Sequence, residues 1–359
     1  MNILDKYILK EFLKFFIIVF VSFVVLYMIV DFFAKARMFL SNHATVMQMA
    51  TYLLYSIPNI VSMVLPASIL LATLMTYSSL SKFSEITAMK ANGISLYRMA
   101  LPSLFVAVFT SLFFFFFNEL ITPYSVRQTE QIIKVDVQKY YSQLFFKYNE
   151  IWYRNENTIY NFKYFDIDSL TMKGVSLYYM KPDFTLEKRI SAKNAKWENG
   201  RWILDELMII TFDENNTPIL KWDSQQTADI PEKPETFRSI QQEIENLGYF
   251  DLRKYVGKIA SEGYDTTKYE VILAGKIAFP FVMVLMIFIG ISFSLRSERG
   301  GGVMQSIAVG IVIGFSYWIV HALFMATGQS GRLPPFVAAW AANILFGIAG
   351  AFLFYRVRT

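Results

Sequence analysis

The residues that could support catalysis are few, and their spacing fits neither a nucleotide-binding loop nor a metal site. Gly257-Lys258 and Gly275-Lys276 are each followed by isoleucine, so neither completes the Gly-Lys-Ser/Thr loop that holds nucleotide phosphates. His43 and His321 are the only histidines, and neither has a carboxylate cluster near it in sequence. The absence of cysteine excludes disulfides, thiolate metal sites and cysteine nucleophiles. We therefore expect no enzymatic activity, no metal and no cofactor, and interpret both histidines as structural.

One short polar segment, Ser84–Gly93, has the pattern of a helix between two apolar stretches. Ser84 and Ser81 are the two candidate caps for its start, because serine is a residue type that caps helices, and Asn92-Gly93 is a typical helix end. Ile86 and Met89 share one face of this helix, and Glu85 lies beside them. Two interpretations stay open: an interfacial helix that lies on lipid headgroups, or a coupling helix whose apolar face and Glu85 dock into a groove on a cytoplasmic partner.

Six apolar stretches of the sequence are each long enough to cross a membrane, and Ser84–Gly93 lies between the second and the third. A hydrocarbon core about 30 Å thick needs about 20 apolar residues in a helix. The 54% hydrophobic content and the mean hydropathy of +0.36 agree with a membrane protein. In the fifth stretch, Gly310 and Gly314 are spaced for close helix packing. The expected spans are Phe12–Phe33, Tyr52–Tyr77, Met99–Ile121, Val271–Leu295, Val303–Met325 and Phe336–Tyr355.

Residues 123–268 contain no apolar run of that length and are expected to form a soluble domain between the third and fourth spans. Short strand patterns predict a β-sandwich or jelly roll, and Asn199-Gly200 predicts a tight hairpin turn. Residues 128–141 and 252–262 are expected to be helices at the two borders of this domain. The sequence therefore divides into helices with the coupling segment (1–122), the soluble domain (123–268) and further helices (269–359).

The distribution of basic residues predicts the orientation, because Lys and Arg are retained in short cytoplasmic loops. With both termini in the cytoplasm, ten basic residues lie inside and three outside. Those inside are Lys6, Lys10, Lys14, Lys82, Lys90, Arg98, Arg296, Arg299, Arg356 and Arg358, and those outside are Lys35, Arg37 and Arg332. The soluble domain is therefore expected outside the cytoplasm. Membrane anchoring also accounts for the net charge of +5, so we expect no nucleic-acid partner.

Four segments together resemble one family. They are Leu4–Ile8, Ser84–Gly93, Tyr269–Pro280 and Gly331–Pro335. In these segments, and in its helix count and inserted domain, the chain is similar to the lipopolysaccharide export permeases of the LptF/LptG (YjgP/YjgQ) family, and most like the LptG branch. The resemblance implies a membrane α-helical fold of six transmembrane helices with an inserted periplasmic β-jelly-roll domain between helices 3 and 4.

The resemblance also implies the function and the partners. The chain would be the permease subunit of an ABC-type exporter that extracts lipopolysaccharide from the outer leaflet of the inner membrane and passes it to a periplasmic bridge, as part of outer-membrane biogenesis. A cytoplasmic LptB-like ATPase dimer would use the ATP, and a second, LptF-like permease and a single-helix, LptC-like adaptor would complete the assembly. In the family, the glutamate of the coupling helix matches Glu85, and Ile86, Met89 and Gly93 belong to the same segment.

For the lipid, the resemblance points to basic residues near the outer end of the first helix, Lys35 and Arg37. Lipid A phosphates favour cations at headgroup height, where charge-assisted hydrogen bonds are strong. Ordinary contact with phospholipid headgroups is the alternative for both residues. Lys276 is costly in the fourth span without a partner. We expect it to form an ion pair with Glu270 or Asp31, or to contact the substrate.

Two alternative functions belong to other classes. A lipid-modifying enzyme at the outer surface would need converging His, Asp or Glu residues at loop ends, whereas the loops contain only scattered ones. A structural scaffold for a periplasmic adaptor would account for the soluble domain, but it leaves the glutamate-bearing cytoplasmic helix without a role.

Overall fold

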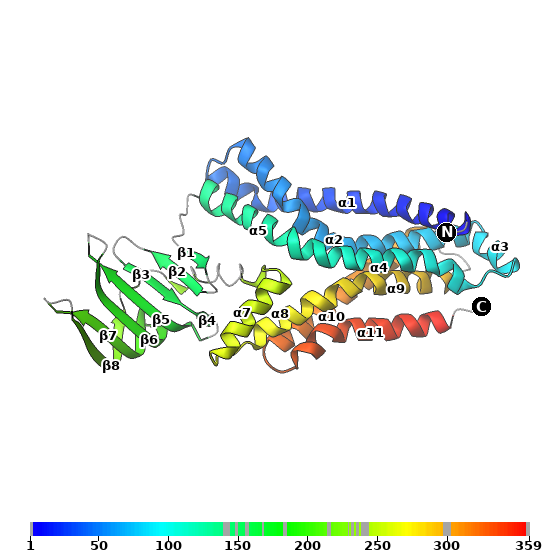
Figure 1. Ribbon diagram of the computed structural model, residues 1–359. Helices are drawn as coiled ribbons and strands as arrows, with labels where there is room; N and C mark the ends of the chain where they lie inside the picture. The colour runs from blue at the N-terminus through cyan, green and yellow to red at the C-terminus, as the bar shows by residue number, and fades with distance from the viewer. Residues whose placement is uncertain are drawn as a thin grey trace. The chain divides into compact units, whose positions relative to one another are not determined.

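The protein is described by a computed structural model, in which long helices form one unit and an antiparallel sheet forms another (Figure 1). The structure describes residues 3–138, 144–147, 150–154, 158–166, 169–181, 185–213, 217–228, 230, 233–234, 237, 244–296 and 303–356. Three consecutive glycines, Gly300–Gly302, are typical of a turn, and they lie outside these residues. The first unit contains Met1–Val137, Gly248–Phe250 and Thr266–Thr359, and the second contains Gln138–Leu247 and Asp251–Asp265.

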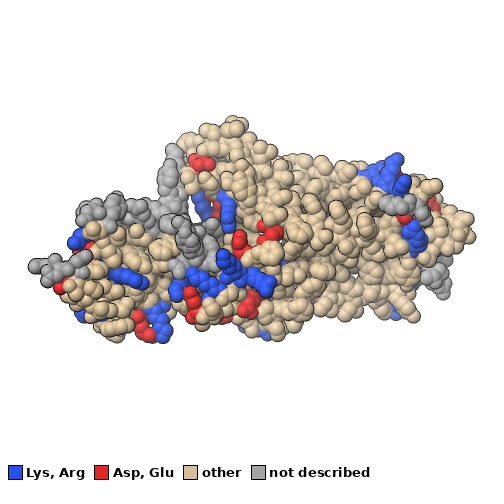
Figure 2. Space-filling model, viewed as in Figure 1, with Lys and Arg blue, Asp and Glu red and all other residues tan. Residues whose placement is uncertain are grey.

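The helices follow the apolar stretches of the sequence. Their bounds are α1 Ile3–Ser41, α2 Val46–Lys82, α3 Glu85–Ala91, α4 Leu96–Leu120, α5 Thr122–Gln131, η1 Ile132–Val137, α7 Tyr249–Ser261, α8 Thr267–Ala278, η2 Phe279–Phe281, α9 Val282–Arg296, α10 Val303–Gln329 and α11 Pro335–Tyr355. Six helical segments are long and apolar enough to cross a membrane, which confirms the six predicted spans. Several extend beyond the apolar stretches, because polar helical turns continue at their ends. On the face drawn in Figure 2, the middle of the helix bundle is almost free of charged side chains.

Helix α2 lies at the centre of the first unit and contacts α1, α9 and α10. It begins with a capping box, in which Thr45 and Gln48 each satisfy a backbone amide of the other. In its most apolar stretch of 18 residues, 72% of the residues are buried. Pro58 and Pro66 lie inside this helix, and a membrane helix tolerates prolines where neighbouring groups satisfy the freed backbone carbonyls.

Close approach between α2 and its neighbours depends on glycine and on buried hydroxyls. A Cβ on Gly290 of α9 would lie 2.9 Å from Thr73, and one on Gly310 of α10 would lie 2.4 Å from Leu71. Gly314, by contrast, has no atom within 4 Å of such a Cβ. The expected close packing is therefore present at Gly310, which lies against Leu71 and Leu74 of α2, and is wrong for Gly314: the two glycines share a face, but no described residue approaches the second.

The third long helix continues past its apolar stretch through α5 and the π-helical turn η1, as far as Val137. Sequence analysis placed this extension at residues 128–141, of which 139–141 lie outside the described residues. At the end of α4, the Glu119 carboxylate accepts hydrogen bonds from the amides of Tyr249 and of Phe250, the latter at 3.1 Å. This contact fixes the start of α7, whose expected range of 252–262 agrees with the observed helix.

The second unit is built on an antiparallel sheet inserted between the third and fourth spans, as predicted, and it is consistent with a jelly-roll-like domain. The strands are β1 Leu144–Lys147, β2 Glu150–Arg154, β3 Thr158–Phe162, β4 Tyr164–Asp166, β5 Thr171–Met180, β6 Leu186–Glu198, β7 Arg201–Phe212 and β8 Pro218–Ala228. Their order is β1-β2-β3-β5-β6-β7-β8, with β4 paired to β5. The predicted Asn199-Gly200 turn joins β6 to β7, and both residues have positive φ, at 52° and 80°.

The buried core of the second unit contains a cluster of aromatic residues. Trp202, Phe165 and Phe237 contact one another, with ring centroids 5.5–6.2 Å apart, and Phe162 packs against Phe237 at 5.1 Å. All four side chains are buried. Strand β7 alternates buried and less buried residues, as expected for a sheet with one covered face.

Candidate functional site

The first candidate site is the short helix α3, at the end of the bundle where α1 begins (Figure 1). The predicted end at Asn92-Gly93 is confirmed: Gly93 has φ +78°, and the amide of Ile94 donates to the carbonyl of Met89 at 3.0 Å. The predicted serine cap is wrong. Ser84 occupies the N-cap position with a left-handed backbone at φ 59°, and its side chain makes no capping hydrogen bond. Packing, rather than a cap, must therefore hold α3 in place.

That packing uses the apolar face of α3. Ile86 is only 4% exposed and belongs to the core cluster of the bundle, and Met89 packs against the same cluster. The prediction that the apolar face docks on a partner is therefore wrong for Ile86, which the chain's own helices cover, and it stays a prediction for Met89, which is half-buried. The polar face of α3 remains outside, where Thr87 and Ala88 are exposed.

Glu85, at the first position of α3, contacts the start of α1. The hydroxyl of Tyr7 donates a hydrogen bond of 2.7 Å to Oε2 of Glu85, across 78 residues of sequence. A carboxylate accepts at both oxygens, so this bond leaves geometric room for a second donor. Glu85 is half-buried, and a bond to an ionised acceptor is stronger than one between neutral groups.

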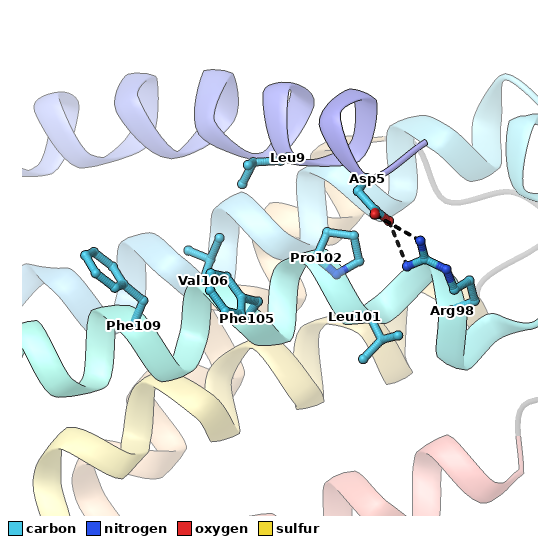
Figure 3. A pocket seen from close by; sticks show the side chains of 8 residues that line it. All are labelled: Asp5, Leu9, Arg98, Leu101, Pro102, Phe105, Val106 and Phe109. Carbon is cyan, nitrogen blue, oxygen red and sulfur yellow. Dashed lines mark hydrogen bonds and ion pairs between the residues drawn. The ribbon is translucent and has the colours of Figure 1, made fainter. Parts of the chain in front are cut away.

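Beside this contact, an ion pair joins the first turns of α1 and α4. The two terminal nitrogens of the Arg98 guanidinium group, Nη1 and Nη2, contact Oδ1 and Oδ2 of Asp5 at 2.7 and 2.9 Å (Figure 3). The pair closes one end of an apolar groove of about 390 Å³ between the two helices. The groove is lined by Asp5, Leu9, Arg98, Leu101, Pro102, Phe105, Val106 and Phe109. Sequence analysis assigned Arg98 only to membrane orientation and missed this pair.

The second candidate site lies near the other end of α1, where three polar side chains meet. Nζ of Lys35 donates to Oδ1 of Asp31 at 2.5 Å and also to the hydroxyl of Tyr52 on α2. The Tyr52 hydroxyl in turn donates to Oδ2 of Asp31 at 2.7 Å, and Nζ lies 4.9 Å from the centre of the Tyr52 ring. Lys35 is thus half-buried and already paired, whereas Arg37 is exposed.

A small apolar cluster holds this site in place. Phe39 and Tyr52 pack at 5.4 Å and share the cluster with Ile132 and Val137 of η1. The side-chain amide of Gln48 also donates, through Nε2, to the backbone carbonyl of Asp136 at 3.1 Å, and this bond connects the start of α2 to η1. A π-helical turn, a rare feature that often marks functional positions, therefore packs directly on the tyrosine that holds Lys35.

The remaining predicted residues, Lys276 and Glu270, lie on α8. Glu270 accepts a 2.7 Å hydrogen bond from Oγ1 of Thr266, and Lys276 is half-buried in the last turn. Asp31 bonds to Lys35 and Tyr52 rather than to α8 in the contacts described above. An ion pair of Lys276, or its contact with substrate, remains a prediction.

Another polar contact that sequence analysis missed lies inside the bundle, where the fourth span is interrupted by η2. The amide of Asn343 donates to the carbonyl of Ala278 at 2.7 Å, and Asn343 accepts from the hydroxyl of Tyr317 at 2.6 Å. Pro280 in η2 disturbs the regular backbone bonding here, so α11 supplies the replacement donor. His321 is buried and stacks on Tyr317, which agrees with a structural role.

Comparison with known proteins places these sites in context. The family model described as "Lipopolysaccharide export system permease LptF/LptG" matches residues 6–356. The lipopolysaccharide export system permease protein LptG of Haemophilus influenzae is 22% identical over 367 residues, which cover 99% of both chains. The protein of the same name from Escherichia coli K12 is 24% identical over 316 residues, covering 85% of this chain and 84% of the relative.

Proposed function

The chain belongs to the LptF/LptG family and is a multi-pass inner-membrane permease subunit of the lipopolysaccharide export system, and we propose that it extracts lipopolysaccharide from the outer leaflet and passes it to a periplasmic bridge. In this proposal it is a transport subunit without catalytic residues. A separate cytoplasmic ATPase dimer hydrolyses the ATP, and a second permease and a single-helix periplasmic adaptor complete the assembly.

The proposed orientation has both termini and α3 in the cytoplasm and the domain of residues 123–268 in the periplasm. The excess of basic residues around the ends of α1, α2, α4 and α11 on one side supports it. Because the chain has no cysteine, single cysteines at exposed positions test the orientation directly. A membrane-impermeant thiol reagent applied to intact spheroplasts should label Lys193→Cys of the sheet and leave Lys6→Cys unlabelled. The reverse pattern would overturn the orientation.

The observation on which the coupling proposal depends is the geometry of α3. Ile86 holds α3 against the bundle, while Thr87 and Ala88 are exposed and Glu85 is half-buried at the start of the helix. In the proposal, a basic group of the ATPase pairs with Glu85, and ATP-driven closure of the ATPase dimer moves α3. Met89 and Gly93 then act inside the permease, by packing and by ending the helix, rather than in the partner contact.

The proposed lipid route runs along α1 and α10. In their most apolar stretches of 18 residues, only 6% of the residues of α1 and 17% of those of α10 are buried, the two smallest values among the six spans. These two helices therefore offer the most apolar surface to acyl chains or to a second permease. At the headgroup end, Arg37 is an exposed cation, and Lys35 is held at the same level by Asp31 and Tyr52. We propose that Arg37 contacts a lipid A phosphate first and that Lys35 joins it.

The decisive experiment is co-purification of the permease with its co-expressed ATPase and second permease. The variant Glu85→Lys should insert normally but lose the ATPase, because it places like charges at the contact. Glu11→Lys, with the same charge change on α1, is the matched control and should retain the ATPase. Wild-type assembly and export by Glu85→Lys would show the coupling proposal to be wrong.

A second experiment tests the lipid contact with photo-crosslinking residues placed in α1. A crosslinker at Arg37 should capture lipopolysaccharide, and one at Val46, an exposed position at the start of α2, is the control. Lys35→Ala should reduce the yield of a crosslinker placed at Phe33. Equal capture of phospholipid and lipopolysaccharide at Arg37 would favour the ordinary headgroup interpretation instead.

A further inference from the structure

We infer that Tyr7 is the positioning residue that connects the coupling helix α3 directly to α1, so that movement of α3 reaches the Lys35 end through one uninterrupted helix. The inference rests on the proposed function, because it takes α3 as the element that the ATPase moves. It adds a route that does not pass through the central helix α2. It assigns a role to a side chain outside the predicted coupling segment.

The contact itself is specific. Tyr7 reaches Glu85 with its hydroxyl at 2.7 Å, and Oε2 is the accepting atom. The ring is 39% exposed, so the core does not need it as a packing residue, and the hydroxyl makes the bond to α3. Since one carboxylate can accept from two donors, Glu85 can receive a basic group of the ATPase at Oε1 while it remains bonded to Tyr7. Glu85 would then join the partner and α1 through a single side chain.

The first turn of α1 also contacts the segment that follows α3 in the chain. The paired contacts between Asp5 and Arg98 join it to the first turn of α4, which follows α3 in the chain (Figure 3). Ile8 and Phe12, one and two turns further on, are fully buried in the core. The start of α1 is therefore bonded to α3 through Tyr7 and to α4, which follows α3, through Asp5, so a displacement of α3 that leaves α1 behind breaks the bond between Tyr7 and Glu85.

From Tyr7 onward, α1 lacks the two residue types at which helices most often kink. Its 39 residues contain neither glycine nor proline. At 1.5 Å per residue, Tyr7 and Lys35 are about 42 Å apart along one axis. The other route differs, because α2 contains Pro58 and Pro66. A stiff helix with little buried surface at its centre transmits a shift or tilt from one end to the other.

The test compares two tyrosines of α1 in the complex purified with the ATPase, the second permease and a periplasmic acceptor. Tyr7→Phe removes only the hydroxyl that bonds to Glu85. Tyr27→Phe is the matched control, since its hydroxyl contacts only the sulfur of Met63, at 3.2 Å, in the described contacts. We expect Tyr7→Phe to retain the ATPase and its KM for ATP, while the ATP hydrolysed per lipopolysaccharide released rises about tenfold, as for a lost bond to a charged group.

A second measurement reads the movement itself. Spin labels at Lys6→Cys and Thr87→Cys, both exposed positions, report the separation of α1 and α3 in the nucleotide-free and ATP-trapped complexes. With Tyr7 present the separation should stay constant, and with Tyr7→Phe it should change between the two states. Wild-type coupling and a constant separation in Tyr7→Phe would overturn the inference, and so would loss of the ATPase, which would make Tyr7 a docking residue. Failure of the proposed function is seen separately, as normal assembly and export by Glu85→Lys.

Discussion

Helix α1 has 39 residues and α2 has 37, and the two lie against each other in the bundle. They differ in how much of their surface the chain covers. In the most apolar 18-residue stretch of each helix, 6% of the residues are buried in α1 and 72% in α2. The polar contacts differ as well: α1 has its ion pairs near its two ends, whereas α2 has buried hydroxyls along its length, such as Thr73, Thr76 and Ser78.

Because of this difference, we expect α2 to stabilise the bundle and α1 to be the helix that moves. Helix α2 interlocks with α9 and α10 at short distances, so any shift of α2 disturbs several interfaces at once. Helix α1 is anchored by Ile8 and Phe12 at one end and by Phe39 at the other, and little of its middle is covered by the chain. Helix α2 is therefore suited to form the fixed centre of the bundle, and the neighbouring helix α1 is suited to move. Four substitutions test this division.

The largest effect is expected from a proline in the middle of α1, at Val25, which is 49% exposed. Proline removes a backbone bond and costs a helix interior about 3 kcal/mol. Neighbouring side chains compensate for this at the prolines of α2, but around Val25 little of the chain is near enough to do so. Val25→Pro should therefore abolish export in proteoliposomes, with Val25→Ala unaffected. Export by Val25→Pro at the rate of Val25→Ala would mean that α1 need not be continuous.

The next largest effect is expected where α9 meets α2. A Cβ on Gly290 would lie 2.9 Å from both Cβ and Cγ2 of Thr73, a branched side chain that cannot turn away easily. Gly290→Leu should lower the free energy of unfolding by about 1–3 kcal/mol through overpacking. Val21→Leu, on the exposed face of α1, is the matched enlargement and should change it little. Reversible unfolding in mixed micelles measures both, and equal losses would remove the contrast between the helices.

The six spans and the hairpin could be predicted from sequence because their signals are local. A run of about 20 apolar residues selects a spanning helix regardless of its neighbours. Asn199, Gly200 and Gly93 have positive φ angles, which glycine and asparagine accept more readily than most residues. These features follow from consecutive residues, so no tertiary information is needed to place them.

The contacts that connect the sites could not be predicted in the same way. Tyr7 and Glu85 are 78 residues apart, and Asp5 and Arg98 are 93 apart, so no spacing rule relates them. The covered face of α3 was misassigned for a related reason. An apolar pair such as Ile86 and Met89 reads the same in sequence whether it packs on the chain itself or on a partner, and only the tertiary structure distinguishes the two.

A smaller effect is expected from removing one buried hydroxyl of α2. Ser78 lies 2.5 Å from the hydroxyl of Ser306 and 3.4 Å from that of Ser294, so it joins α2 to both α9 and α10. Ser78→Ala leaves the Ser306 hydroxyl without this partner and should cost about 1 kcal/mol of unfolding free energy. The same unfolding measurement applies. An unchanged value would indicate that the three serines are close without being bonded.

The smallest effect is expected from the same substitution on α1, at Ser22. Its hydroxyl donates to the carbonyl of Ile18 within its own helix at 2.7 Å, and the residue is exposed. Removing this hydroxyl leaves no buried group without a hydrogen-bond partner. Ser22→Ala should therefore change the unfolding free energy of the isolated chain by less than about 0.5 kcal/mol. Repeating the measurement in the assembled complex sharpens the comparison. If Ser22→Ala becomes destabilising only there, a partner covers this face of α1, and the freedom of α1 belongs to the isolated chain alone.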